Sequence, residues 1–195
     1  MKFFVATKNP GKIREFERIF TALGDETLSE KDFKNPMPEP VEDGKSFIEN
    51  ALIKARAGVV FTGLPSVADD SGLCVDALSG APGIFSARYA GVHGDDEANN
   101  RKLLSELSNV PMEKRTAHYT CAIACVFPDG REFVVEDKCN GYIDFSESGN
   151  EGFGYDPLFI SDIGKFSEIP AEKKDEISHR GKAVKKFEEK LKEYL

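Results

Sequence analysis

The chain lacks both a long hydrophobic run and an excess of positive charge. None of its apolar runs approaches the roughly 20 residues that a membrane-spanning helix requires. Its 26 basic residues are outnumbered by 34 acidic ones, which gives a formal net charge of −8. Non-specific binding to DNA or RNA needs a basic face that displaces counterions. We therefore expect neither a membrane nor a nucleic acid as a partner.

Cysteine and tryptophan are also scarce. There is no tryptophan, and the four cysteines, at positions 74, 121, 125 and 139, lack the paired Cys-x-x-Cys spacing of zinc sites. They lie in apolar runs, which favours buried thiols in a reducing compartment. The first apolar run, Phe3 to Ala6, ends at Thr7 and does not have the form of a secretion leader. We expect a cytoplasmic protein.

The composition supplies enough apolar mass for one core. The chain is 40% hydrophobic and 31% charged, as is ordinary for a globular protein, and 15 phenylalanines give the core its bulk. A length of 195 residues suits one domain or two close lobes. We take residues 1–195 as a single domain.

The order of the apolar patterns predicts an α/β fold. Residues 2–6 read as a strand, and apolar side chains at helical spacing follow in residues 13–23. Residues 116–127 and 131–136 predict an antiparallel hairpin, and residues 178–191 predict a last helix. Together these elements give a mixed sheet flanked by helices.

The segment from Ser66 to Val75 combines a strand pattern with two adjacent carboxylates, Asp69 and Asp70. Side chains alternate along a strand, so the two point to opposite faces unless the chain turns at Gly72. A buried carboxylate needs a cation, a donor or a metal, and carboxylates suit magnesium. The alternative is that both are ordinary residues of a strand end, one of them capping a turn.

The loop from Thr7 to Lys12 has the features of a phosphate site. Asn9 can cap the following helix, with Pro10 at its first position, and free backbone N–H groups at a helix start attract anions. Lys8 and Lys12 strengthen that field. The loop does not match a Walker A motif, and a capped helix with two surface lysines is the structural alternative.

A second helix is predicted after Glu42 and Asp43. It begins at Ser46 and carries an apolar stripe that we assign to the core: Phe47, Ile48, Ala51, Leu52, Ala55 and Val59. Asn50 and Lys54, four residues apart, form a polar stripe. Glu42 either supports the helix dipole or serves as a second metal ligand near Asp70.

Two further segments suggest a ligand. The loop 148–158 places Phe153 and Tyr155 among glycines, where an aromatic ring can stack on a nucleobase or fold back into the core. His179 and Arg180 put two potential cations into the first turn of the last helix, where they oppose its dipole. An acceptor-rich ligand nearby would explain them, although such residues also occur at ordinary surfaces. In combination, these features favour a nucleoside triphosphate with magnesium.

On these residues the chain resembles the inosine triphosphate pyrophosphatase family, the house-cleaning hydrolases of noncanonical purine nucleotides, also called dITP/XTP pyrophosphatases. The resemblance runs through six blocks in order: 7–12, 42–51, 68–73, 80–89, 152–157 and 178–181. It implies a homodimer with an elongated mixed sheet flanked by helices and two lobes around a central active-site cleft. The implied reaction is Mg²⁺-dependent hydrolysis of XTP, ITP and dITP to the monophosphate and pyrophosphate, which keeps these nucleotides out of DNA and RNA.

The resemblance also implies roles for individual residues. Asp70 would be the general base, and Glu42 and Asp70 would bind the metal. The phosphates would be held by Thr7, Lys8, Asn9, Pro10, Gly11 and Lys12. The rest of the substrate would be bound by Ser71, Phe153, Gly154, Tyr155, Asp156, Lys174, His179 and Arg180. Lys173 adjoins Lys174 and could take its place. Further candidates are Asn50, Lys54, Asp69 and Arg88.

Two rival functions stay open at this point. A haloacid-dehalogenase-type phosphatase needs Asp-x-Asp after a strand, whereas this chain has Asp69-Asp70-Ser71. A nucleotide sensor would bind the substrate without turnover. Arginine carries only donors, so a pocket lined by Arg180 accepts a 6-oxo purine and disfavours the 6-amino group of adenine.

Overall fold

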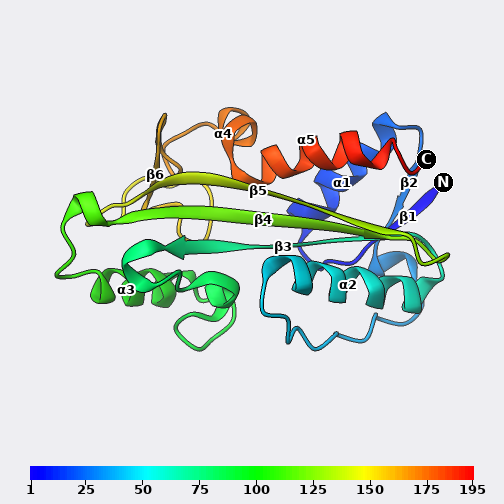
Figure 1. Cartoon of the computed structure of the whole chain (residues 1–195), viewed down its shortest axis with the longest axis horizontal. Coiled ribbons are helices and arrows are strands. Elements are labelled where there is room, and N and C mark those ends of the chain that lie inside the picture. Colours follow the sequence, from blue (N-terminus) through cyan, green and yellow to red (C-terminus); the bar gives the residue numbers. More distant parts are fainter. The chain divides into compact units, whose positions relative to one another are not determined.

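The computed structural model describes residues 1–195, apart from the side chain of Glu15, and it divides into two compact units. Unit 1 comprises Met1–Asp70, Ala122–Glu136 and Val184–Leu195. Unit 2 comprises Ser71–Cys121 and Asp137–Ala183. Figure 1 traces the chain through its elements.

Strands and α-helices alternate at the start of the chain and separate into runs later. The strands are β1 (Lys2–Val5), β2 (Glu26–Leu28), β3 (Ser66–Val75), β4 (Thr116–Val126), β5 (Glu132–Ile143), β6 (Phe159–Ser161) and β7 (Gly164–Lys165). The helices are α1 (Pro10–Ala22), α2 (Phe47–Thr62), α3 (Asp96–Glu106), α4 (Ala171–Ile177) and α5 (His179–Leu191). The proline-rich segment 35–40 is neither helix nor strand, because proline cannot supply the backbone donor that either needs.

The seven strands form one sheet in the order β2-β1-β3-β4-β5-β6-β7. β1 pairs in parallel with β2 and with β3, whereas β6 pairs antiparallel with β5 and with β7. The sheet is therefore mixed, which confirms the predicted α/β class. The boundary between the units falls within β3, at the Asp70–Ser71 peptide bond.

In unit 1, β1 is buried on both faces, and its two adjacent phenylalanines pack to opposite sides. Phe3 stacks on Phe20 of α1 with ring centroids 4.2 Å apart, whereas Phe4 packs against Phe61 of α2 at 5.7 Å. Alternation along a strand produces this division. α1 and α2 accordingly lie on opposite sides of the strands of unit 1 (Figure 1), and Phe187 of α5 packs on the α1 side.

The buried face of α2 differs from the predicted stripe. Ile48, assigned to the core, is exposed, while Asn50 and Gly58 are buried beside Ala51 and Ala55. Gly58 is required there because a Cβ atom would lie 2.1 Å from the Ser66 hydroxyl of β3. The helix thus approaches the strands too closely for large side chains, and this shifts its buried face toward small residues and Asn50.

In unit 2, the core gathers around Leu73, Leu103, Tyr119, Phe159 and Phe166. Strand β5 runs to Ile143, beyond the predicted end at Glu136. The prediction ended too early because the second half of the strand is mostly polar and does not show a strand pattern. β6 pairs with this second half, with Tyr142 opposite Ile160. Helix α4 was not predicted either, since its seven residues are short and mostly charged.

No helix in the described part of the chain combines the length and the apolar character that crossing a bilayer requires.

The predicted burial of the cysteines is confirmed for three positions: Cys121, Cys125 and Cys139 are buried, while Cys74 is half-buried. Burial raises the pKa of the Cys139 thiol, which keeps it protonated and unreactive.

Candidate active site

The two adjacent carboxylates of β3 have different lysine partners. Asp69 is 3% exposed, and its Oδ2 lies 2.7 Å from the Nζ of Lys12 on α1. Asp70 Oδ1 lies 2.9 Å from the Nζ of Lys54 on α2. Because α1 and α2 cover opposite sides of the strands, the predicted alternation holds, and β3 continues through Gly72 without a turn.

Lys54 joins the second carboxylate to a third acidic side chain. Its Nζ lies 3.2 Å from Glu42 Oε2, and Asn50 Nδ2 donates to Asp70 Oδ2 at 3.3 Å. We call Glu42, Asn50, Lys54 and Asp70 the carboxylate–lysine cluster. Asn50 and Lys54 lie one helical turn apart on α2, so both side chains reach the same strand position.

Burial and charge act on the cluster in opposite directions. Burial raises the pKa of Asp70, and the attraction and hydrogen bond of Lys54 only partly offset this, so its pKa lies above the ordinary value. Burial lowers the pKa of Lys54, but the charges of Asp70, Asp69 and Glu42 outweigh it and raise the pKa overall. Lys54 therefore stays an ammonium at neutral pH and compensates the charge of Asp70.

The cluster has the donor set for a hard divalent ion. Among the described residues, no group of three or more His, Cys, Asp or Glu side chains is arranged to hold a metal. Magnesium, however, needs only one or two carboxylates, because it keeps several water molecules. Glu42 and Asp70 converge on one cation, Lys54 Nζ, and Asn50 Oδ1 is buried without a hydrogen-bond partner in the described structure. Two convergent carboxylates fit magnesium, and rotation of the Asn50 amide, whose Nδ2 donates to Asp70 here, would turn its unused oxygen toward the same place.

The loop before α1 is built as predicted, with one correction. Asn9 caps the helix and Pro10 occupies its first position. The backbone N–H groups of Gly11 and Lys12 are not free, however, because both donate to Asn9 Oδ1, at 2.8 and 3.3 Å. The predicted anion attraction therefore depends on the lysines, since the cap already uses these N–H groups. Lys8 Nζ lies 3.8 Å from Glu39 in an exposed pair, which is weak.

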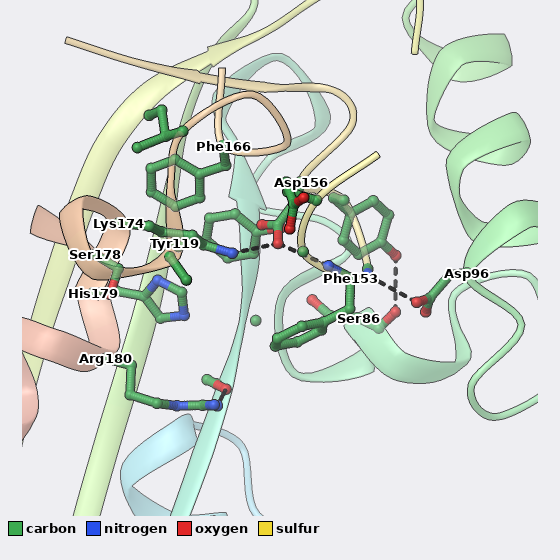
Figure 2. Close-up of a pocket in the computed structure, with 18 of the residues that line it drawn as sticks. Ser86, Asp96, Tyr119, Phe153, Asp156, Phe166, Lys174, Ser178, His179 and Arg180 are labelled. Carbon is green, nitrogen blue, oxygen red and sulfur yellow. Dashed lines mark hydrogen bonds and ion pairs between the residues drawn. The ribbon is translucent and has the colours of Figure 1, made fainter. Parts of the chain in front are cut away.

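Unit 2 contains a pocket with a volume of about 340 Å³ (Figure 2). Its size and its mostly apolar walls are those of a small-molecule site. The lining includes all of the predicted substrate residues from position 71 onward: Ser71, Phe153, Gly154, Tyr155, Asp156, Lys174, His179 and Arg180. They come from β3, the loop 152–156, α4 and α5, and only the tertiary fold brings them together.

The two aromatic residues of the glycine-rich loop have separate environments. Tyr155 is buried at 4% exposure and its hydroxyl donates to the backbone oxygen of Ser86 at 2.8 Å. Phe153 is 63% exposed and does not fold back into the core. Lys174 forms an ion pair with buried Asp156, and its Nζ lies 5.3 Å from the centroid of the Phe153 ring. The loop thus offers one open aromatic face.

His179 and Arg180, at the start of α5, face the same space. His179 stacks on Tyr119 with centroids 4.6 Å apart, and Arg180 Nη2 donates to the Ser71 hydroxyl at 3.2 Å. In Figure 2 the ring of Phe153 lies on one side of the open space, with His179 and Arg180 on the other. The pocket can therefore offer both a ring for stacking and a guanidinium for hydrogen bonding to one planar ligand.

Several lining residues were not predicted from the sequence. Ser86, Asp96, Tyr119 and Phe166 line the pocket, yet each lies in an element whose pattern has an ordinary structural explanation. Arg88, a further candidate, does not line the pocket, and its guanidinium lies 5.2 Å from the centroid of the Phe85 ring. Lys174 rather than exposed Lys173 reaches the site.

Comparison with known proteins places this chain in one family. The model of the Ham1 family matches residues 3–190. The chain belongs to the Ham1 family. A relative of this Ham1 family protein, the dITP/XTP pyrophosphatase of Geobacter sulfurreducens, is 51% identical over 185 residues, which cover 94% of this chain and 92% of the relative. The predicted resemblance is confirmed.

Two solved structures agree with this fold. The Ham1 protein of Staphylococcus aureus matches with a TM-score of 0.92 at 36% identity and covers 100% of both chains. A nucleoside-triphosphatase / dITP/XTP pyrophosphatase from Mycobacterium abscessus matches with a TM-score of 0.82 at 47% identity, over 96% of this chain and 97% of its own.

Proposed function

We propose that this protein hydrolyses the noncanonical purine nucleoside triphosphates XTP, ITP and dITP to the monophosphate and pyrophosphate, and so removes them from the nucleotide pool. The observation that carries the proposal is the role of two adjacent residues in strand β3. Asp70 belongs to the carboxylate–lysine cluster, and the next residue, Ser71, lines the pocket with the open aromatic face. Relatives named as dITP/XTP pyrophosphatases over nearly the whole chain support it.

The carboxylate–lysine cluster and the Thr7–Lys12 loop would serve the triphosphate. Glu42 and Asp70 would hold Mg²⁺, which, when bound, polarises phosphoryl oxygens and neutralises their charge. Lys8 precedes α1 and Lys12 lies in its first turn, and both would add positive charge for the phosphates. Asp69 keeps Lys12 in place through its buried ion pair.

Asp70 would act as the general base. Its burial raises its pKa, which strengthens the carboxylate as a proton acceptor, while Lys54 keeps it ionised near neutral pH. Asn50 fixes the second carboxylate oxygen by donating to it. Asp70 can then take a proton from the water that attacks phosphorus, and positively charged groups stabilise the leaving pyrophosphate.

The pocket of unit 2 would select the base. Phe153 offers its exposed face for stacking, and such stacking accepts any base. Selection then falls to the polar groups, of which the Arg180 guanidinium is a pure donor. The 6-oxo group of a purine can accept a hydrogen bond from Arg180. The 6-amino group of adenine would instead place its own N–H donors against those of Arg180, which strongly disfavours binding of adenine nucleotides.

The test is to incubate the purified protein with ITP, XTP, GTP and ATP, with and without Mg²⁺, and to identify both products. We expect the monophosphate and pyrophosphate from ITP and XTP, only with the metal, and little turnover of ATP. Release of inorganic phosphate as the first product would favour the phosphatase alternative. Intact ITP after hours with Mg²⁺ would favour a sensor.

Two expectations that accompany this function stay predictions, namely the homodimer and the cytoplasmic location. The oligomeric state is measured by light scattering during size-exclusion chromatography. A single mass near that of one 21.5 kDa chain at all concentrations would contradict the dimer.

A further inference from the structure

In the loop 152–156, hydrogen bonds hold the backbone of Phe153 and the side chain of Tyr155, while the ring of Phe153 stays exposed. Phe153 N–H donates to Asp156 Oδ2 at 2.9 Å, and Tyr155 is held by its hydroxyl at Ser86. Gly152 leaves room for this turn, because a Cβ atom there would lie 2.1 Å from Asp156 Oδ2. Only the ring of Phe153 projects from the loop and is exposed.

The remaining residue, Gly154, is held from α3 by two side chains one helical turn apart. Its N–H donates to Asp96 Oδ2 at 2.7 Å, and its carbonyl oxygen accepts from Asn100 Nδ2 at 3.0 Å. Both backbone groups of one glycine are therefore fixed by one helix face. Asn100 is 3% exposed, and its Oδ1 has no hydrogen-bond partner among the described residues. The hydrogen bond from its Nδ2 to Gly154 is therefore what fixes this buried side chain.

We propose that Asp96 and Asn100 are positioning residues that hold the Phe153 ring ready for stacking on the purine base, by clamping Gly154. The proposal rests on the proposed function, because the ligand is the base of ITP. Gly152 and Gly154 both have positive φ, at 82° and 61°. Glycine has a wide choice of backbone conformations, so without the clamp the free loop would sample more of them, and binding of a base would have to restrict the loop to one. The clamp removes that entropic penalty before binding.

The clamp makes a specific prediction about binding and turnover. Asp96 and Asn100 act on the base, which is remote from the reacting phosphorus, so their loss raises KM and leaves kcat within about twofold. Ordering one loop side chain upon binding corresponds to a change of about fivefold in affinity. We therefore expect Asp96→Ala to raise KM for ITP about fivefold. Asp96→Asn keeps an acceptor oxygen for Gly154 and should restore most of the wild-type KM.

The matched control is Glu97→Ala. Glu97 is also acidic, lies next to Asp96 in the first turn of α3 and is exposed, but it forms an ion pair with Arg101 instead of contacting the loop. Its loss changes the helix dipole interaction as much as Asp96→Ala does. We expect KM for ITP to stay unchanged in Glu97→Ala.

The experiment is a double-mutant cycle with Phe153→Ala, with KM and kcat for ITP measured in each variant. If Asp96 acts through Phe153, Asp96→Ala changes nothing further in the Phe153→Ala background. An effect that persists there would overturn the proposal, because Asp96 would then contact the substrate or stabilise the fold by itself. An unchanged KM in Asp96→Ala would also overturn it. A wild-type protein without ITP turnover would instead refute the proposed function.

Amide hydrogen exchange tests the clamp without any substrate. The Gly154 amide should exchange faster in Asp96→Ala than in the wild type, and it should keep its protection in Glu97→Ala and Asp96→Asn. Equal exchange in all four proteins would refute the clamp. Asn100→Ala provides a second test through the carbonyl of Gly154, and because Asp96 is exposed its variants remain informative even if the buried Asn100 variant does not fold.

Discussion

Neutralising Asp70 should separate activity from stability. In Asp70→Asn, the side chain keeps its shape but loses the negative charge and the ability to accept a proton. General base catalysis contributes about 10²- to 10⁴-fold to a rate, so we expect kcat for ITP to fall by about 10³-fold or more. The loss of one of two proposed metal ligands adds to this effect.

The fold should tolerate the same change. The pKa of Asp70 is raised in the folded protein, mainly by burial, so folding disfavours its ionised form at neutral pH. A neutral side chain removes that cost, while Lys54 keeps Glu42 as a partner at 3.2 Å. Asn50 can rotate its amide and accept from the new amide through Oδ1. We expect the free energy of unfolding at neutral pH to change by less than about 1 kcal/mol.

The assay is pyrophosphate release from ITP, together with urea unfolding followed by circular dichroism. The control is Asp43→Asn, which neutralises an exposed carboxylate next to Glu42 and should leave both measurements unchanged. Near wild-type kcat in Asp70→Asn would refute the role of Asp70 as base. A loss of several kcal/mol in stability would show that the charge of Asp70 supports the fold.

Three further variants test other parts of the structure. In Glu42→Gln the Mg²⁺ concentration for half-maximal activity should rise about tenfold, and an unchanged requirement would exclude Glu42 as a ligand. In Arg180→Ala the ratio of kcat/KM for ITP over ATP should fall about tenfold, and a constant ratio would contradict base selection by Arg180. The hydrogen bond from Lys165 lowers the pKa of Asp144, so this pair stabilises the fold above the ordinary carboxyl pKa and loses that effect as pH falls. Between about pH 6 and pH 3, the free energy of unfolding should therefore fall less in Asp144→Asn than in the wild type, and equal slopes would refute the coupling.

Much of the fold could be predicted from local pattern. α1 begins at its predicted cap, Asn9, and α5 buries Val184, Phe187 and Leu191 as predicted. These elements are strongly periodic or have clear end signals, and such signals depend on neighbouring residues alone. The second half of β5 and helix α4 were missed because they are polar or short, and partners distant in the sequence stabilise them.

The candidate site divides in the same way. Residue type and position made Asp70 and Arg180 candidates, since a carboxylate in an apolar strand and a cation that opposes a helix dipole require an explanation that involves a partner. Which partner each one has could not be read locally. Lys54 lies 16 residues before Asp70, and Arg180 lies 109 residues after Ser71.

By itself, the sequence determined which chemical groups this protein has available, because the kinds of side chain and their order limit what the chain can bind: they predict acidic groups for a divalent ion, lysines for phosphates, and an aromatic ring and an arginine for a base. The tertiary structure decided which of these groups meet. It turned Phe153 outward and Tyr155 inward, used the N–H groups of Gly11 and Lys12 for a cap, and brought Asp96 and Asn100 to Gly154. Such pairings depend on packing between segments far apart in the chain, which no local pattern records.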